Sequence, residues 1–122
     1  MERLTQPEED ALRGLWPLPG GGFVKDVLDG LPAPRPPYTT LASTLRNLER
    51  KDYVRAEKLG NSYRFVPLVS ADDYQRRSLG TLVSQHFQNS YKDLVSFFAQ
   101  EQKISTAELQ EIIDLIEQQK PR

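Results

Sequence analysis

The chain contains no cysteine and only one histidine among its 122 residues. Without cysteine it can form no disulfide, no thiolate metal site and no cysteine nucleophile. The lone histidine, His86, and scattered carboxylates provide neither a strong metal site nor a nucleophile–base pair. We therefore predict that the chain is not an enzyme and that it uses no metal or other cofactor.

Long apolar runs are also missing, so the sequence predicts no transmembrane helix and no direct membrane insertion. The segment Met1–Thr5 lacks the basic and then apolar pattern of a signal peptide. Hydrophobic residues make up 38% of the chain and charged residues 27%, which is typical of a globular protein. We expect a cytoplasmic protein.

Excess charge of either sign is absent from the chain as a whole, because the net charge is −1. Taken alone, this value argues against nucleic-acid binding. The charges are unevenly distributed, however. Residues 35–64 hold seven Lys and Arg against three Asp and Glu, whereas residues 71–122 hold six against eight. The middle of the chain is therefore basic and the C-terminal part acidic.

The basic segment contains an amphipathic helix, which we expect over residues 38–51. Leu41, Leu45 and Leu48 recur at helical spacing and should be buried on one face. The opposite face carries Thr39, Ser43, Arg46 and Arg50, which can contact phosphates or base edges. Thr39 or Thr40 is expected to cap the first turn.

A β-hairpin is predicted directly after this helix. Residues 53–57 and 62–66 favour strands, and they flank a turn over residues 58–61 that contains Gly60 and Asn61. Asp52 is expected in the left-handed conformation that ends the helix. Pro67 should end the second strand.

The segments before the basic helix complete a recognisable order of elements. Thr5 and Glu8 predict a capping box for a helix that ends near Trp16. A flexible turn over Gly20–Gly22, a short strand over residues 23–24 and a brief helix over residues 24–29 follow, before a proline-rich loop over residues 31–37. Helix, helix, helix and hairpin in this order predict a winged helix-turn-helix domain over residues 1–70.

This arrangement leads to a hypothesis of double-stranded DNA binding, with the basic helix in the major groove and the hairpin clamping the backbone. The candidate DNA-binding residues are Thr39, Thr40, Ser43, Arg46, Asn47, Arg50, Arg55, Lys58 and Arg64.

Residues 71–122 are predicted to be helical, with helices that begin at Asp72 or Asp73, at Asn89–Ser90 and at Ser105. Their apolar stripes exceed what a short tail can bury, so we expect a dimerisation domain that pairs two copies of the chain. The candidate dimerisation residues are Leu79, Leu82, Leu94, Phe98, Leu109, Ile112, Ile113 and Ile116. A monomer whose tail folds back onto the winged domain is the alternative.

Several local strings, taken in order, resemble the penicillinase-repressor family, which includes β-lactamase, methicillin-resistance and copper-responsive repressors. The strings are Leu4-Thr5, Glu8-Glu9, Leu15-Trp16, residues 24–28, residues 38–41, residues 49–51 before Tyr53-Val54, residues 57–60, residues 94–98 and Ile104-Ser105. The resemblance implies a homodimeric winged-helix repressor bound to palindromic operators, with targets among antibiotic-resistance or stress genes.

The resemblance also implies a mode of release, in which a membrane sensor protease triggers cleavage of the repressor. The candidate cleavage residues are Phe97 and Phe98, and Phe97 stands where antibiotic-responsive members carry asparagine. Asn47 replaces a common basic residue, and Asp52 replaces the usual glycine. The cysteine-rich hook of copper-responsive members is absent.

Two other functions stay open at this point. One is a ligand-responsive winged-helix regulator with a small-molecule pocket between the tail and the winged domain. The other is a winged-helix protein-interaction module that does not bind DNA.

Overall fold

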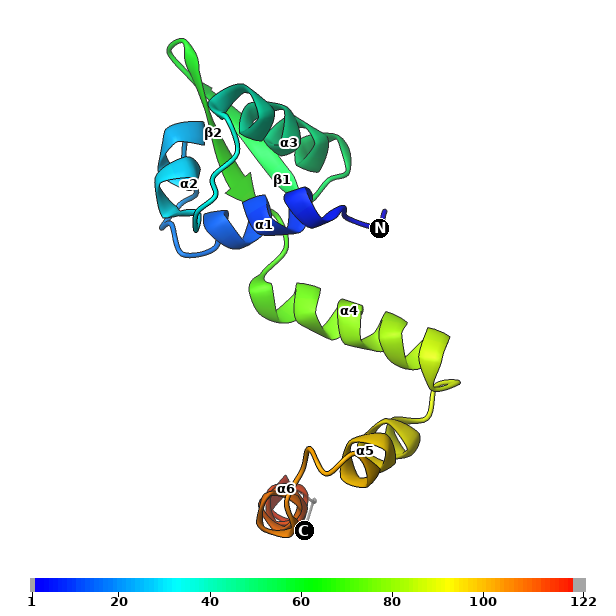
Figure 1. Cartoon of the computed structure of the whole chain (residues 1–122). Coiled ribbons are helices and arrows are strands. Elements are labelled where there is room, and N and C mark those ends of the chain that lie inside the picture. The colour runs from blue at the N-terminus through cyan, green and yellow to red at the C-terminus, as the bar shows by residue number, and fades with distance from the viewer. Residues whose placement is uncertain (1, 120–122) are drawn as a thin grey trace. The chain divides into compact units, whose positions relative to one another are not determined.

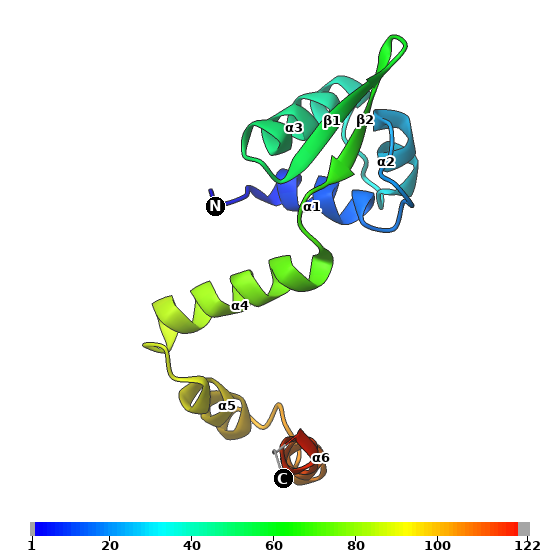
Figure 2. The same ribbon diagram turned by 180° about the vertical axis from the view of Figure 1, so that it is seen from behind.

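The computed structural model describes residues 2–119 of the chain, which form six helices and one hairpin (Figures 1 and 2). The order is α1 (Gln6–Leu15), α2 (Val24–Gly30), α3 (Tyr38–Arg50), β1 (Val54–Leu59), β2 (Ser62–Pro67), α4 (Ala71–His86), α5 (Tyr91–Gln100) and α6 (Thr106–Gln119). The predicted fold class, mainly helical with a small β wing after the third helix and C-terminal helices, is confirmed. No helix within residues 2–119 has the length and apolar character needed to cross a membrane.

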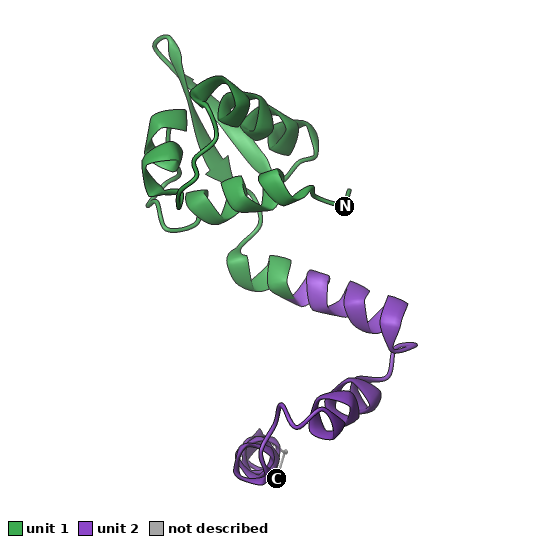
Figure 3. Cartoon of the chain, viewed as in Figure 1, with its two compact units in different colours: residues 1–75 green, residues 76–122 purple. Residues whose placement is uncertain are grey.

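The chain divides into two compact units, residues 1–75 and residues 76–122 (Figure 3). The first unit contains α1, α2, α3, the hairpin and the first turn of α4. The second contains the rest of α4 with α5 and α6.

The core of the first unit lies between its three complete helices and the hairpin. Leu12 of α1, Leu45 and Leu48 of α3, and Phe65 of β2 are almost completely buried. Full burial of one such side chain stabilises the fold by roughly 1.5–3 kcal/mol. The buried leucine stripe therefore holds α3 in place and leaves its other face at the surface.

Both ends of α1 are held by specific hydrogen bonds. The predicted capping box is confirmed, because the Thr5 hydroxyl accepts from the backbone of Glu8 and the Glu8 carboxylate accepts from the backbone of Thr5. Trp16 caps the C-terminus and packs against the core, and its indole N–H donates to the Val69 carbonyl at 2.9 Å. Tyr74 packs on Trp16 with ring centroids 5.8 Å apart, which ties the first turn of α4 to the first unit.

The start of α3 agrees with the prediction, but its cap differs. The helix begins at Tyr38, and its N-cap residue is Pro37, which makes no side-chain cap. The Pro37 carbonyl already accepts from Leu41, so the first helical turn closes before either threonine could serve as a cap. Thr39 and Thr40 lie inside the first turn, and both are exposed. Asp52 has a φ of 67°, so the predicted left-handed residue after the helix is confirmed.

The hairpin is longer than predicted, because β1 continues to Leu59 and pairs it with Ser62 across a Gly60–Asn61 turn. The expected strand at residues 23–24 was wrong. Gly22 forms a single bridge with Phe65, and Phe23 precedes the first residue of α2.

The glycine run before α2 forms the predicted turn and makes a close contact with the hairpin. A Cβ on Gly21 would lie 2.1 Å from the Phe65 carbonyl oxygen, and Gly21 has a φ of 88°. Only glycine combines that backbone conformation with that approach. The run therefore packs against β2 of the hairpin.

The helices of the second unit begin at capping residues but bury little. Ser105 caps α6 at the predicted position and forms a capping box with Glu108, and Ser90 caps α5. The prediction for α4 was wrong by two or three residues, since Ser70 accepts from the Asp73 backbone in place of an aspartate cap. Within the part of the chain that the structure describes, α4 buries only Val83, and α5 and α6 bury none of their residues.

Candidate nucleic-acid interface

The face of α3 opposite its leucines lies at the surface of the first unit. Leu41, Leu45 and Leu48 are at most 2% exposed, as predicted. Thr39, Thr40, Ser43, Arg46 and Arg50 are exposed, and Asn47 is half-buried. Thr44 on the inner side satisfies its hydroxyl by donating to the Thr40 carbonyl at 3.0 Å. The outward side chains lie at the surface, where a ligand as large as a duplex can reach them.

Arg46 joins α3 to the hairpin. Its guanidinium lies 4.0 Å from the ring centroid of Tyr63 in β2, and its Nη1 donates to Glu49 at 2.9 Å. The hydrogen bonds with Glu49 and then Tyr63 raise the pKa of Arg46. The side chain of Arg46 is nevertheless 45% exposed. This arginine therefore positions the hairpin beside the helix while keeping part of its charge at the surface.

Arg50 lies one turn further along α3, and no carboxylate of the described residues pairs with its guanidinium. Its Nη2 donates to the Asn47 side-chain oxygen at 2.7 Å, and among the described residues it forms no ion pair. The bond to Asn47 holds the guanidinium along the outer face. A phosphate or a guanine edge would find this cation oriented in advance.

The hairpin carries three cations, and a single carboxylate holds two of them. Glu57 accepts from Arg64 at 2.8 Å and from Arg55 through its other oxygen. The hydrogen bonds from Arg64 and then Arg55 lower the pKa of Glu57. Lys58 is exposed and makes no ion pair within residues 2–119. The hairpin thus presents one free cation and two cations that are held by Glu57.

Sequence reasoning missed the partners Glu49, Tyr63 and Glu57. Glu49 could have been found from its i,i+3 spacing to Arg46 on a helix. Tyr63 and Phe65 alternate on one face of β2, and Glu57 stands opposite Arg64 in the hairpin register. That register became readable only with the true length of β1.

The candidate dimerisation residues form an apolar surface in the second unit. Six of the eight are between 39% and 53% exposed, and Leu94 and Leu109 are half-buried. The six exposed residues are Leu79, Leu82, Phe98, Ile112, Ile113 and Ile116. The candidate cleavage residues Phe97 and Phe98 lie inside α5, with ring centroids 5.6 Å apart, and both are exposed.

Within residues 2–119, no three His, Asp or Glu side chains lie close enough together to hold a metal ion.

Comparisons with known proteins identify the family. The family described as penicillinase repressor matches residues 4–118, which is nearly the whole chain. No curated protein matches the chain. The resemblance drawn from the local strings is thereby confirmed. The chain belongs to the penicillinase repressor family, whose members are winged-helix transcriptional repressors that bind operator DNA, form dimers and are not enzymes.

Proposed function

We propose that the chain binds palindromic operator DNA as a homodimer, with α3 in the major groove and the hairpin on the adjacent backbone. The observation that carries this proposal is the exposed polar face of α3 beside a cationic hairpin, joined to it through Arg46 and Tyr63. The proposed contacts are Thr39, Thr40, Ser43, Arg46, Asn47 and Arg50 from α3, and Arg55, Lys58 and Arg64 from the hairpin.

The two free cations have different proposed tasks. Arg50 lies on the helix that would enter the groove, so it is the proposed base or phosphate reader of α3. Lys58 lies near the tip of the hairpin and would contact only phosphate. A base contact adds sequence discrimination, whereas a phosphate contact adds affinity to every duplex about equally.

The test is a gel-shift titration with duplex DNA from upstream of the chain's own gene and a scrambled duplex of equal length. Arg50→Ala should weaken binding to the upstream duplex by roughly 1–3 kcal/mol. Lys58→Ala should weaken binding to both duplexes by the same factor. It should also reduce the slope of the logarithm of the binding constant against the logarithm of the salt concentration by about 0.9. Arg13→Ala, an exposed and ion-paired arginine of α1, removes the same charge and serves as the control. If Arg50→Ala and Lys58→Ala bind both duplexes as tightly as the parent, the DNA-binding proposal is wrong. A protein-interaction role would then remain.

The proposed dimer interface is the apolar surface of the second unit. Its support is the exposure of six large apolar side chains over α4, α5 and α6. Apolar area left in water costs about 25 cal/mol per Å², so pairing two such surfaces is favourable. Two α3 helices related by a two-fold axis would then read two halves of a palindrome. The division into a DNA-binding domain and a dimerisation domain belongs to the same proposal.

The resemblance supports two finer proposals. The regulated genes serve antibiotic resistance or stress, and release follows cleavage between Phe97 and Phe98 through a membrane sensor protease. A cut there would separate α6 and its isoleucines from the rest of the chain. We expect the protein to work in the cytoplasm, where its operator would lie. Mass spectrometry of the chain from cells exposed to a β-lactam tests the cleavage, because a fragment that ends at Phe97 should accumulate; an intact chain with lost operator binding would contradict it.

A further inference from the structure

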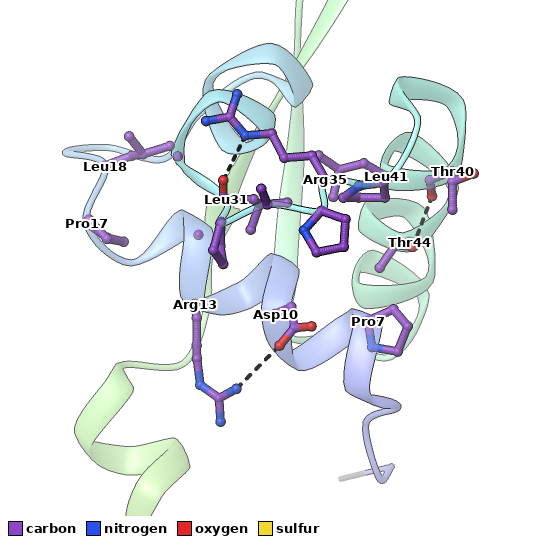
Figure 4. Close-up of a pocket in the computed structure, with 16 residues that line it drawn as sticks. Pro7, Asp10, Arg13, Pro17, Leu18, Leu31, Arg35, Thr40, Leu41 and Thr44 are labelled. Atoms are coloured by element: carbon purple, nitrogen blue, oxygen red, sulfur yellow. Dashed lines mark hydrogen bonds and ion pairs between the residues drawn. The ribbon is translucent and has the colours of Figure 1, made fainter.

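A groove of about 850 Å³ lies wholly within the first unit, on the side formed by α1, the 31–37 loop and the first half of α3 (Figure 4). Most of its lining is apolar and includes Pro7, Leu18, Leu31, Pro36 and Leu41. Pockets of this size and character are typical of small-molecule sites. The sequence-based alternative placed a ligand pocket between the tail and the winged domain, whereas every residue that lines this groove belongs to the first unit.

The 31–37 loop gives the groove its wall. Four of its seven residues are proline, so the segment cannot coil into a helix. Instead, Leu31 is buried in the core, and the rest of the loop is exposed or half-buried up to the start of α3. Such a loop loses little further conformational entropy when a ligand packs against it, because proline already fixes its backbone.

The charges around the groove do not cancel. Arg13 lies 3.6 Å from Asp10 and also pairs with Glu9 at 3.4 Å, so its charge is already matched by carboxylates. Arg35 pairs with no carboxylate among the described residues. Its Nε donates to the Leu31 carbonyl at 2.8 Å and its Nη2 to the Asp29 carbonyl at 2.9 Å, as the close-up shows for Leu31 (Figure 4). These two bonds fix the guanidinium at the rim of the groove and leave other N–H donors unused.

We propose that this groove binds an organic anion with an aromatic or branched apolar body. The anionic end pairs with Arg35, and the apolar body lies against the prolines and leucines of the lining. The unbalanced positive charge at Arg35 selects an anion over a neutral molecule of the same shape. A guanidinium held in advance offers two parallel N–H donors to a carboxylate or sulfonate at low entropic cost.

The test uses the full chain and two fluorescent probes with nearly the same apolar body. 1-Anilinonaphthalene-8-sulfonate is an anion, and N-phenyl-1-naphthylamine is its neutral counterpart. The parent should bind the sulfonate more tightly. Arg35→Gln should weaken sulfonate binding roughly tenfold or more and leave the neutral probe within about twofold. Arg13→Gln, which removes the groove cation that is already paired, should leave sulfonate binding within about threefold.

A second measurement locates the site on the unaltered chain. In ¹H–¹⁵N correlation spectra, the sulfonate should shift the amide signals of Gly14, Gly30 and Thr40, which line the groove. Shifts confined to residues 76–122 would place the probe on the apolar surface of the second unit and overturn the proposal. Equal sulfonate affinities for the parent and a folded Arg35→Gln would also overturn it. Neither measurement involves DNA, so the outcome is independent of the proposed operator binding.

Discussion

Glu57 shows how a single carboxylate can set the strength of a cationic surface. It accepts hydrogen bonds from both Arg55 and Arg64, so in the proposed complex a DNA phosphate would compete with it for two of the three hairpin cations. The same arginines lower the pKa of Glu57, so it stays ionised in any neutral buffer. In the proposed complex, Glu57 would therefore limit the contact of Arg55 and Arg64 with phosphate.

Replacing Glu57 by glutamine should tighten DNA binding. Glu57→Gln keeps the shape of the side chain but frees two guanidinium charges, so we expect affinity to rise several-fold and the salt slope to steepen by up to about 1.8 for two added phosphate contacts. Gel-shift titrations at several salt concentrations measure both. Glu101→Gln, an exposed acid at the end of α5, is the charge-matched control. Equal gains in the two variants would mean that net charge alone matters.

The ion pair between Glu8 and Lys51 joins α1 to the end of α3. Lys51 Nζ lies 2.7 Å from Glu8 Oε1, and the side chains of Glu8 and Lys51 are only 4% and 14% exposed. Burial by itself raises the pKa of Glu8, but the hydrogen bonds from Lys51 and Thr5 outweigh it and lower the pKa. A lowered folded-state pKa gives stability that is present above pH 4.3 or so and is lost as the pH falls.

Lys51→Met should leave this carboxylate buried without its partner, which costs roughly 3 kcal/mol of unfolding free energy at pH 7. The loss of stability between about pH 5 and pH 3 should also be smaller in the variant than in the parent. Urea denaturation at several pH values measures both effects. Lys25→Met, an exposed lysine of α2, should change neither. Parallel pH profiles for the parent and Lys51→Met would contradict the assignment.

At the scale of the elements, the glycine run before α2 needs glycine partly because it contacts the hairpin. Gly20 and Gly21 both have a positive φ, but a Cβ on Gly20 would meet nothing within 4 Å, whereas a Cβ on Gly21 would strike the Phe65 carbonyl. The two positions therefore separate backbone strain from steric exclusion.

Gly20→Ala should cost about 1–2 kcal/mol for the left-handed backbone alone. Gly21→Ala should cost that amount and more, about 2–4 kcal/mol in all, because the run must move away from β2. Thermal or urea unfolding of the two variants makes the comparison. An equal loss of unfolding free energy in the two variants would show that the close approach of Gly21 to Phe65 does not affect stability.

Features that depend on neighbouring residues were predicted from the sequence, whereas features that depend on residues far away along the chain were not. The leucines of α3 and the Thr5–Glu8 box are local patterns, and both were predicted correctly. The contact of the glycine run was missed, because its partner Phe65 lies more than forty residues away. The cap of α3 was wrongly assigned to Thr39 or Thr40 because threonine is a common cap, and only the structure shows the Pro37 carbonyl closing the first turn. Likewise, the acids that hold Arg46, Arg55 and Arg64 depend on packing and register.

At the scale of the whole molecule, the helices of the second unit were predicted well, whereas the role of its apolar surface was not. Its three helices were predicted, and two of their three caps were placed correctly. Its large apolar side chains are exposed, and the helical pattern alone did not show what covers them.

A charge placed in the proposed interface should separate the two copies. Ile113 is 49% exposed on the apolar stripe of α6, so Ile113→Glu should bury an unpaired carboxylate in a dimer and shift the protein to monomer. Gln118→Glu adds the same charge on the other side of α6 and should leave the dimer intact. Sedimentation velocity measures the mass of each variant. A dimer that survives Ile113→Glu would move the interface away from this stripe.

Among the described residues, α5 and α6 bury none of their side chains. Helices of ten and fourteen residues are marginal in water when they stand alone, so in the proposed dimer they fold mainly as they associate. Association depends on abundance, because the pairing of two copies is governed by mass action. When copies are scarce, occupancy of the operator then rises with the square of their number. Repression would set in over a narrow range of expression, and a repressor that controls its own gene would settle near that threshold.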